Sequence, residues 1–510
     1  MLKPAEEAQW TKRSAAHLLN RAGFGGCPDQ IEHLYTMGRH KAVGSLLNDA
    51  NDREKFPDPE WTAPEAVEEM RREFMEIRRI NNDQSMSPAE REMARREAQR
   101  NQRLQQRRMT QESIELWLSR MLSSQAQTRE KMTLFWHGHF ATSIQKVKSP
   151  LLIHQQNALF RSQALGNFKS LTHAICEDPA MMLYLDTDKN VKGRPNENFA
   201  RELLELFTLG EGSGYTETDI AEAARAFTGY QLNRIVGRPT FVPRKHDRGE
   251  KTFMGKSGPF KQDDIVDIVF ETPRCAEFMV AKLWEFFVYE EPADEIVKTL
   301  AKQFRDSGYE VKPLLQTIFL SNEFNSAKAM RTQIKSPVQF IVQMARELEL
   351  PKVPPRIAEN AMQQLGQVLY NPPNVAGWEG GRSWINTNTL LSRYNIAGFL
   401  LKGDKDGGGK AKNRDKGKGN KMRERLKDRV VARMRKSLIP FDRLAPLELR
   451  DDRAALIAAL TERFFHADLP DKDLAKFRDY AKSKESKRFT DEEVGELIHL
   501  MMSTPQYQLV

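Results

Sequence analysis

Two histidines flank a single glycine in the segment F-W-H-G-H-F at 135–140. Neutral imidazole is a common metal ligand and acid–base group, so His137 and His139 are candidates for either role. On a helix their side chains diverge by about 200°, whereas an extended backbone directs both to one side. Gly138 makes a non-helical backbone easy. The structural alternative is that one histidine caps the helix while the other hydrogen-bonds within the core.

A second segment, P-N-E-N-F-A-R-E-L-L-E-L-F-T-L-G at 195–210, is predicted as a helix that begins near Asn196 and ends at Gly210. Its acidic positions include Glu197 and Glu202. Glu202 lies next to the apolar stripe, where a polar group must find a partner, so the helix could present carboxylates to a pocket. The alternative is a surface ladder of ion pairs.

The segment R-K-H-D-R-G-E-K-T-F-M-G at 244–255 combines glycines with cationic side chains. This composition suggests an anion-binding loop, although the spacing is not that of a phosphate-binding P-loop. His246 and Asp247 add a further ligand or base, and Lys251 adds a cation.

Two tryptophans, Trp378 and Trp384, lie in the proline- and glycine-rich segment 371–386. Exposed indoles would suggest stacking on sugars, whereas buried indoles would plug the core. The plug is the favoured interpretation, because an indole is rarely left in water without a partner.

Helical periodicity dominates the rest of the chain, so we expect an all-α protein. We predict one large multi-helical domain with long irregular loops. Its segments are an N-terminal helical segment (1–64), a charged helical arm (65–112), a central helical core with the motifs (113–400), a basic Gly/Lys-rich insertion (401–436) and C-terminal helices that complete the core (437–510).

The arm at 65–112 is rich in interleaved Arg and Glu. Opposite charges three or four residues apart stabilise an exposed helix by about 0.2–0.5 kcal/mol per pair. A break near 81–88 predicts a solvated hairpin. A partner-binding coiled coil is the alternative, but its apolar heptads are sparse.

The net charge of +9 over 510 residues is concentrated in one place. Residues 402–436 hold 15 Lys or Arg and 5 Asp or Glu, a local charge of +10, which leaves about −1 for the remainder. A nucleic-acid-binding fold usually spreads its basic residues over a docking face, and we find no reading module. The basic run is predicted to be a flexible linker, with polyanion binding as the alternative.

The three cysteines, Cys27, Cys176 and Cys275, form no C-x-x-C pair, which argues against a disulfide framework or a cysteine zinc site. Residues 1–10 lack the apolar core of a signal peptide, and no run of 18 apolar residues occurs. A cytoplasmic protein without a membrane span is therefore expected, with export alongside a partner as the alternative.

The motifs occur in an order that resembles the bacterial family called domain of unknown function 1800. The similarity runs through H-L-L-N-R-A-G-F-G at 17–25, the three polar segments above, K-S-P at 335–337, V-A-G-W at 375–378 and W-I-N at 384–386. The resemblance implies a predominantly α-helical protein with no established activity. It also implies an association with exported sulfatase-like proteins, although this chain shows no export signal of its own.

The leading functional hypothesis is a metal-dependent hydrolase-like enzyme, whose activity would require the polar segments to converge. A divalent ion (Zn, Mn or Fe) would activate a water, and Lys251 or Arg201 would balance anionic charge. The candidate metal ligands are His137, His139, Glu197, Glu202 and His246, and the candidate catalytic residues are Glu202, His246, Asp247 and Lys251. The competing hypothesis is a non-catalytic helical scaffold, or partner of an exported sulfatase-like protein, in which the same residues form a buried polar network.

Overall fold

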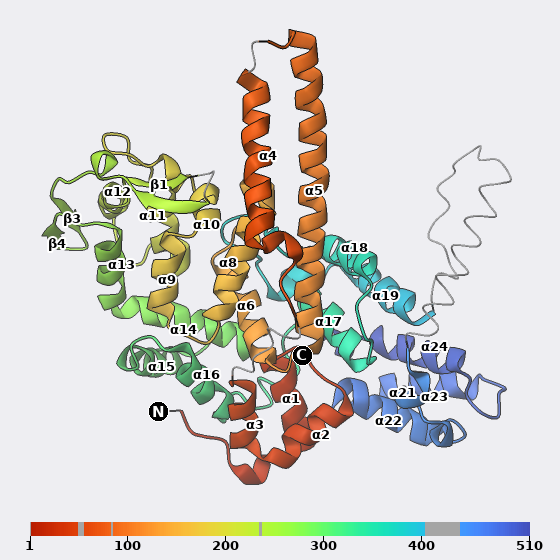
Figure 1. Ribbon diagram of the computed structural model, residues 1–510. Helices are drawn as coiled ribbons and strands as arrows, with labels where there is room; N and C mark the ends of the chain where they lie inside the picture. The colour runs from red at the N-terminus through yellow and green to blue at the C-terminus, as the bar shows by residue number, and fades with distance from the viewer. Residues whose placement is uncertain (1, 49–55, 83–84, 234–236, 403–438) are drawn as a thin grey trace. The chain divides into compact units, whose positions relative to one another are not determined.

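The structure is a computed structural model that describes residues 2–48, 56–82, 85–233, 237–402 and 439–510. Helices dominate these residues, and their strands form two small antiparallel hairpins, so the predicted all-α class is confirmed (Figure 1). Among the described helices, none is both long and apolar enough to cross a membrane. Of the predicted insertion at 401–436, all but the first two residues lie outside the described part of the chain.

The chain divides into two compact units, each assembled from segments that are distant in the sequence. The first unit comprises Met1–Pro4, Leu46–Ser321 and Leu369–Glu379. The second comprises Ala5–Ser45, Asn322–Val368 and Gly380–Val510. Both units draw on the stretch 113–400 that was predicted as the central core.

The first unit contains the three polar segments and both hairpins. Tyr230 pairs with Phe241 in one hairpin, and Lys251 pairs with Gly258 in the other. Its elements are α4 (Pro64–Asn82), α5 (Pro88–Ser123), α6 (Gln127–His139), α7 (Ile144–Val147), α8 (Pro150–Ser162), α9 (Phe168–Cys176), α10 (Pro179–Tyr184), α11 (Asn198–Glu202), α12 (Glu217–Ala226), β1 (Tyr230–Asn233), β2 (Arg238–Phe241), β3 (Lys251–Phe253), β4 (Lys256–Gly258), α13 (Gln262–Glu271), α14 (Pro273–Phe287), α15 (Asp294–Asp306) and α16 (Val311–Leu320).

The second unit is helical. Leu497, Ile498 and Met501 are buried on α24, which packs against α19. Its helices are α1 (Lys12–Ala22), α2 (Pro28–Met37), α3 (Arg39–Leu46, whose last residue belongs to the first unit), α17 (Pro337–Glu347), α18 (Pro355–Leu365), α19 (Thr387–Lys402), α21 (Phe441–Leu444), α22 (Arg453–Phe465), α23 (Asp471–Lys482) and α24 (Asp491–Met502).

Helices α4 and α5 form the predicted arm, a helical hairpin that projects from the first unit (Figure 1). Ser87 and Glu90 form a capping box at the start of α5, and Pro88 supplies the preset backbone angle of a first helical residue. The arm half of α5 is largely exposed. Beyond Met109 the same helix buries Trp117 and Met121, so its second half belongs to the core.

Helix α6 continues through Gly138 to His139, so the backbone at this glycine is helical and the side chains of His137 and His139 diverge around the helix. Almost every side chain of α6 is buried, and a helix that is buried on all sides is held by packing around its whole circumference. Trp136 stacks on Phe140 and Phe168 at ring-centroid distances of 5.9 and 5.7 Å. This packing stabilises the helix more than one glycine destabilises it.

The segment Leu369–Glu379 lies against the end of α6, where Gly377 meets the backbone of Gly138. Gly377 has a φ of +80°, and a Cβ on it would lie 2.2 Å from the carbonyl oxygen of Gly138. A Cβ on Gly138 itself would meet only Trp378, at an ordinary 3.7 Å. The close approach of the two backbones therefore depends on Gly377.

We expect Gly377→Ala to lower the free energy of unfolding by about 2–4 kcal/mol, because it adds both a clash and a strained backbone angle. Gly138→Ala is the matched control and should be neutral or stabilising by up to about 1 kcal/mol, because alanine favours a helix interior. Denaturant unfolding of both variants measures the difference. Equal losses would show that the close backbone contact is not the constraint.

Candidate functional site

His137 is fully enclosed at the end of α6, with 1% of its surface exposed. Its Nε2 accepts a hydrogen bond from the backbone N–H of Tyr370 at 3.0 Å. The ring also lies 5.5 Å from the rings of Trp117 and Trp378. Burial lowers the pKa of His137 to about 3, so the ring is neutral. Because the accepting lone pair already binds a backbone N–H, metal ligation through Nε2 would require breaking that bond.

His139 is buried on a different side of α6 and has partners at both ring nitrogens. Nε2 lies 3.0 Å from the carbonyl oxygen of Phe207, to which it donates, and Nδ1 lies 3.5 Å from Nζ of Lys282. Burial, and after it the charge of Lys282, lowers the pKa of His139 well below its ordinary value. Burial also lowers the pKa of Lys282 to about 8. His139 thus links α6 to the segment that ends the acidic helix and to α14.

The acidic helix is short: α11 passes directly into a π-helical turn at Leu203–Thr208. Arg201 makes ion pairs of 3.2 Å with Glu197, 3.2 Å with Glu205 and 2.8 Å with Glu217. Glu197 is therefore part of a surface ladder, which is the structural alternative for this helix.

Glu202 behaves differently from the ladder. It is half-buried, and no described residue donates a hydrogen bond or forms an ion pair with its carboxylate. Burial, and after it the nearby charge of Glu205, raises the pKa of Glu202. Among the predicted catalytic residues, Glu202 is the carboxylate whose bonding capacity remains open.

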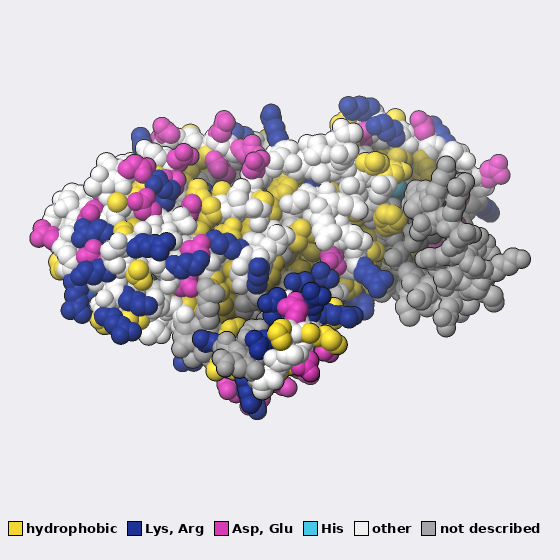
Figure 2. Space-filling view, turned by 90° about the horizontal axis from the view of Figure 1, so that it is seen from above, with side chains coloured by type: hydrophobic (Ala, Val, Ile, Leu, Met, Phe, Trp, Pro, Cys, Tyr) yellow, Lys and Arg dark blue, Asp and Glu magenta, His cyan; other side chains and the backbone are white. Residues whose placement is uncertain are grey.

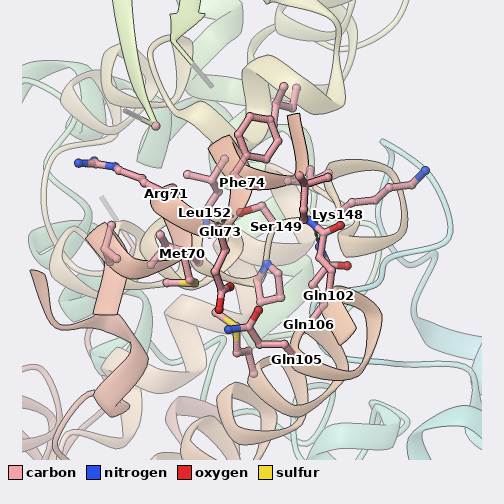
Figure 3. A pocket seen from close by; sticks show the side chains of 18 of the residues that line it. Met70, Arg71, Glu73, Phe74, Gln102, Gln105, Gln106, Lys148, Ser149 and Leu152 are labelled. Carbon is pink, nitrogen blue, oxygen red and sulfur yellow. Dashed lines mark hydrogen bonds between the residues drawn. The ribbon is translucent and has the colours of Figure 1, made fainter. Parts of the chain in front are cut away.

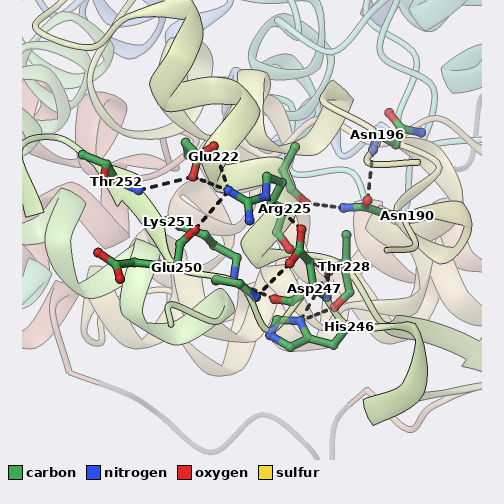
Figure 4. A network of polar contacts seen from close by, with 12 residues as sticks. Asn190, Asn196, Glu222, Arg225, Thr228, His246, Asp247, Glu250, Lys251 and Thr252 are labelled. Carbon is green, nitrogen blue, oxygen red and sulfur yellow. Dashed lines mark hydrogen bonds and ion pairs between the residues drawn. The ribbon is translucent and has the colours of Figure 1, made fainter. Parts of the chain in front are cut away.

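The loop that carries His246, Asp247 and Lys251 is fastened to the end of α12 (Figure 4). His246 Nδ1 lies 2.8 Å from the carbonyl oxygen of Thr228, and Thr228 Oγ1 accepts from the backbone N–H of Asp247 at 2.8 Å. Lys251 Nζ donates to the carbonyl oxygens of Asp247 and Gly249 at 2.7 and 3.0 Å. Burial lowers the pKa values of both His246 and Lys251.

Arg225 holds the same loop from the side of α12. Its Nε donates to Asp247 at 2.8 Å, and its Nη1 donates to Glu222 at 2.7 Å. The bond from Arg225 lowers the pKa of Asp247 to about 2, so this carboxylate stays charged and paired. Arg225 and Thr228 were not among the predicted site residues, although both stand in the run A-R-A-F-T-G at 224–229. Their partners are some 20 residues away, and no local spacing shows such pairing.

The described residues contain no group of three or more His, Cys, Asp or Glu placed to hold a metal ion. The predicted ligands therefore do not form such a group in the part of the chain that the structure describes. The structure brings together His246, Asp247 and Lys251 within one loop. The five predicted metal ligands that do not form a common site among the described residues are His137, His139, Glu197, Glu202 and His246.

The motifs of the second unit also bind backbone groups. His17 Nε2 lies 2.9 Å from the carbonyl oxygen of Phe324, and Arg393 donates to that of Lys335 at 2.7 Å. Lys335 is buried with its Nζ 3.7 Å from the ring centroid of Tyr507. Burial lowers the pKa of Lys335 to about 7.

A cavity in the first unit lies away from these motifs, between the arm and the start of α8 (Figure 3). Its volume is about 1,100 Å³. Apolar side chains dominate its lining, including Met70, Phe74, Ile77, Met109, Leu151 and Leu152. The polar lining residues include the amides Gln102 and Gln106, the cations Arg71 and Lys148, and the carboxylates Glu73 and Glu76. No local sequence pattern predicts this cavity, because it forms between segments that lie far apart in the chain.

Acid should destabilise the first unit through His137. Its folded pKa of about 3 lies below the ordinary 6.5, so between these values the unfolded chain binds a proton that the folded chain does not. This contribution is complete above pH 6.5 and is lost as the pH falls toward 3, by up to about 1.4 kcal/mol per pH unit. His137→Gln should flatten the dependence, measured by denaturant unfolding across this range, whereas His33→Gln on the exposed surface should not. An unchanged slope in His137→Gln would contradict the assignment.

Lys251→Met should destabilise the loop at α12, because it leaves two carbonyl oxygens without their donor. The expected loss is about 1–3 kcal/mol in the free energy of unfolding. Lys256→Met removes a surface ion pair with Glu271 from the same hairpin and should cost less than about 1 kcal/mol. If Lys251→Met leaves stability unchanged, Lys251 has no structural role.

The family described as "Protein of unknown function (DUF1800)" matches residues 17–509. No curated protein and no solved structure matches the chain. The matched range contains the polar segments of the first unit and the motifs of the second. The resemblance inferred from those motifs is confirmed, and the chain belongs to the DUF1800 family.

Proposed function

We propose that this protein is a non-catalytic helical scaffold that binds a partner protein. The observation that carries the proposal is how the motif side chains are bonded. His137, His139 and Lys251 each bind the backbone of the fold, at Tyr370, Phe207 and the 247–249 turn. Groups bonded in this way position segments rather than act on a substrate.

The arm supports a binding role. It exposes two long helical surfaces, and the cavity of about 1,100 Å³ lies at its base rather than among the histidines. Surface helices with exposed apolar side chains, such as Met93 and Leu104 at 76% and 55% exposure, are common at protein interfaces. The partner suggested by the family resemblance is an exported sulfatase-like protein.

A metal-dependent hydrolase is the second candidate, favoured by two observations. Glu202 is half-buried without a hydrogen-bond partner among the described residues, and Nε2 of His246 has none either, while Nδ1 binds Thr228. In this candidate His246 or Glu202 is the base, and Asp247 and Lys251 position the loop. A divalent ion would have to recruit its remaining ligands through a rearrangement.

Metal analysis and partner capture together separate the two candidates. For the scaffold, we expect the full-length protein to carry only traces of Zn, Mn or Fe after purification without chelators. We also expect that adding these ions does not raise Tm, because the imidazole lone pairs of His137 and His139 are already bonded. Co-expression with a sulfatase-like protein should yield a complex that survives gel filtration.

A different result would contradict the scaffold proposal. One equivalent of bound metal that is lost in both Glu202→Gln and His246→Gln, with Tm of the metal-free protein unchanged, would replace the scaffold by the hydrolase. Glu197→Gln is the control, because the surface ladder places this carboxylate on Arg201.

A further inference from the structure

Arginines of the exposed half of α5 form one continuous stripe. Arg96, Arg100, Arg103 and Arg107 follow one another at intervals of four, three and four residues. At 3.6 residues per turn they fall within about 60° around the helix axis and span about 16 Å along it. All four are exposed, and a shallow surface depression runs along them. Seen from above, Lys and Arg side chains crowd together at the arm (Figure 2).

Three of the four arginines of the stripe have no acidic partner among the described residues, unlike several arginines elsewhere on the arm. Elsewhere on the arm, Arg71 pairs with Glu68, and Arg108 pairs with Glu112. Within the described part of the chain, no carboxylate lies within 4.0 Å of Arg100, Arg103 or Arg107, while Arg96 shares Glu92 with Arg95. Residues 95–108 contain six arginines and one acidic residue, Glu97.

This arrangement does not help the helix. Like charges at spacings of three and four residues repel each other, so the stripe destabilises an isolated helix where alternating Glu and Arg would stabilise it. All four side chains are exposed, and among the described residues no hydrogen bond or ion pair joins them to the body of the unit. A partner that supplies negative charge would turn this repulsion into attraction.

We propose that this stripe is the docking surface for an acidic α-helix of a partner protein. The inference rests on the proposed scaffold function and adds the chemistry of the partner. A second helix has the same repeat, so carboxylates at intervals of four, three and four residues would face all four guanidinium groups. Arginine suits this role because its planar fork binds a carboxylate through two parallel hydrogen bonds.

Apolar side chains beside the stripe favour a protein over a nucleic acid. Met93 and Leu104 lie at one edge of the stripe and are among the most exposed apolar side chains of the described residues. Met and Arg are both enriched in protein interfaces, whereas a phosphate backbone offers an apolar side chain nothing to pack against. The stripe also contains no aromatic ring on which an unpaired base could stack.

A second copy of this chain does not fit the stripe. A parallel pair of α5 helices would place each arginine opposite its own copy. An antiparallel pair centred on the stripe would place Arg96 opposite Arg107 and Arg100 opposite Arg103. Both arrangements bring like charges together at the interface centre, which selects against self-association.

The test uses the full-length protein and a synthetic helical peptide with glutamates at the 4-3-4 spacing and one leucine at the edge. A second peptide has the same composition in scrambled order. We expect fluorescence anisotropy at about 0.15 M salt to show binding of the first peptide, weakened by added salt. Arg100→Glu/Arg103→Glu should weaken it by about tenfold or more, because two attractive pairs become repulsive.

The matched control is Arg72→Glu/Arg78→Glu, which makes the same change of charge at exposed positions of α4. It should leave peptide binding within about twofold of the unmodified protein, since a surface charge away from the contact contributes little. The Tm of the stripe variant should be unchanged or higher, because its new carboxylates lie beside Arg96 and Arg107. A folded stripe variant therefore keeps the binding result interpretable.

Several outcomes would overturn the docking surface. For the peptides, these are binding of the scrambled peptide as tight as that of the ordered one, or no binding of either. For the variants, the contradicting result is an equal loss of binding in the α4 control and the stripe variant. Binding of duplex DNA but not of the acidic peptide, or concentration-dependent self-association that the stripe variant abolishes, would also overturn it. None of these bears on the metal content, so the docking surface can fail while the non-catalytic scaffold stands. Conversely, a metal-loaded enzyme could still bind the peptide.

Discussion

The backbone N–H of Tyr370 donates to Nε2 of His137, and this bond holds an irregular segment of chain against the end of α6. A polar group that loses its water on folding must find another partner or it destabilises the fold. His137 is the partner of the Tyr370 N–H, and beside it the close approach of Gly377 to Gly138 lets the two backbones meet. The aromatic core around α6 is closed by this segment, so the position of the W-H-x-H-F motif depends on it.

The same constraint accounts for the loop at α12. Lys251 is buried, and a buried ammonium group is costly unless it is bonded. It donates to two carbonyl oxygens of its own loop, while Thr228 and Arg225 hold the loop from α12. Residue types that are typical of catalysis are also those that can satisfy buried backbone. Lys251 and His137 are bonded in this second way, and Glu202 is the exception that keeps the enzymatic alternative open.

The arm shows why average composition can mislead. Over 65–112, Arg and Glu look evenly mixed, and this mixture correctly predicts an exposed helical hairpin. Arginines and glutamates are not evenly distributed around the helix. Residues 98–107 contain no acidic residue, and the arginines there share one side of α5. Helical phase can be calculated from the sequence once the helix is known to be continuous. Which side faces the body of the unit cannot be calculated, because that depends on α8 and the cavity beneath the arm.

The sequence by itself determined the family, the all-α class and the hairpin, because these follow from ordered motifs, helical periodicity and local charge pairing. It did not determine the backbone at Gly138, where packing around α6 outweighed the preference of a glycine. Nor did it show that Tyr370 is the partner of His137, or that Arg225 is the partner of Asp247. Hydrogen bonds join atoms that are close in space, and only the tertiary structure decides which distant segments supply them.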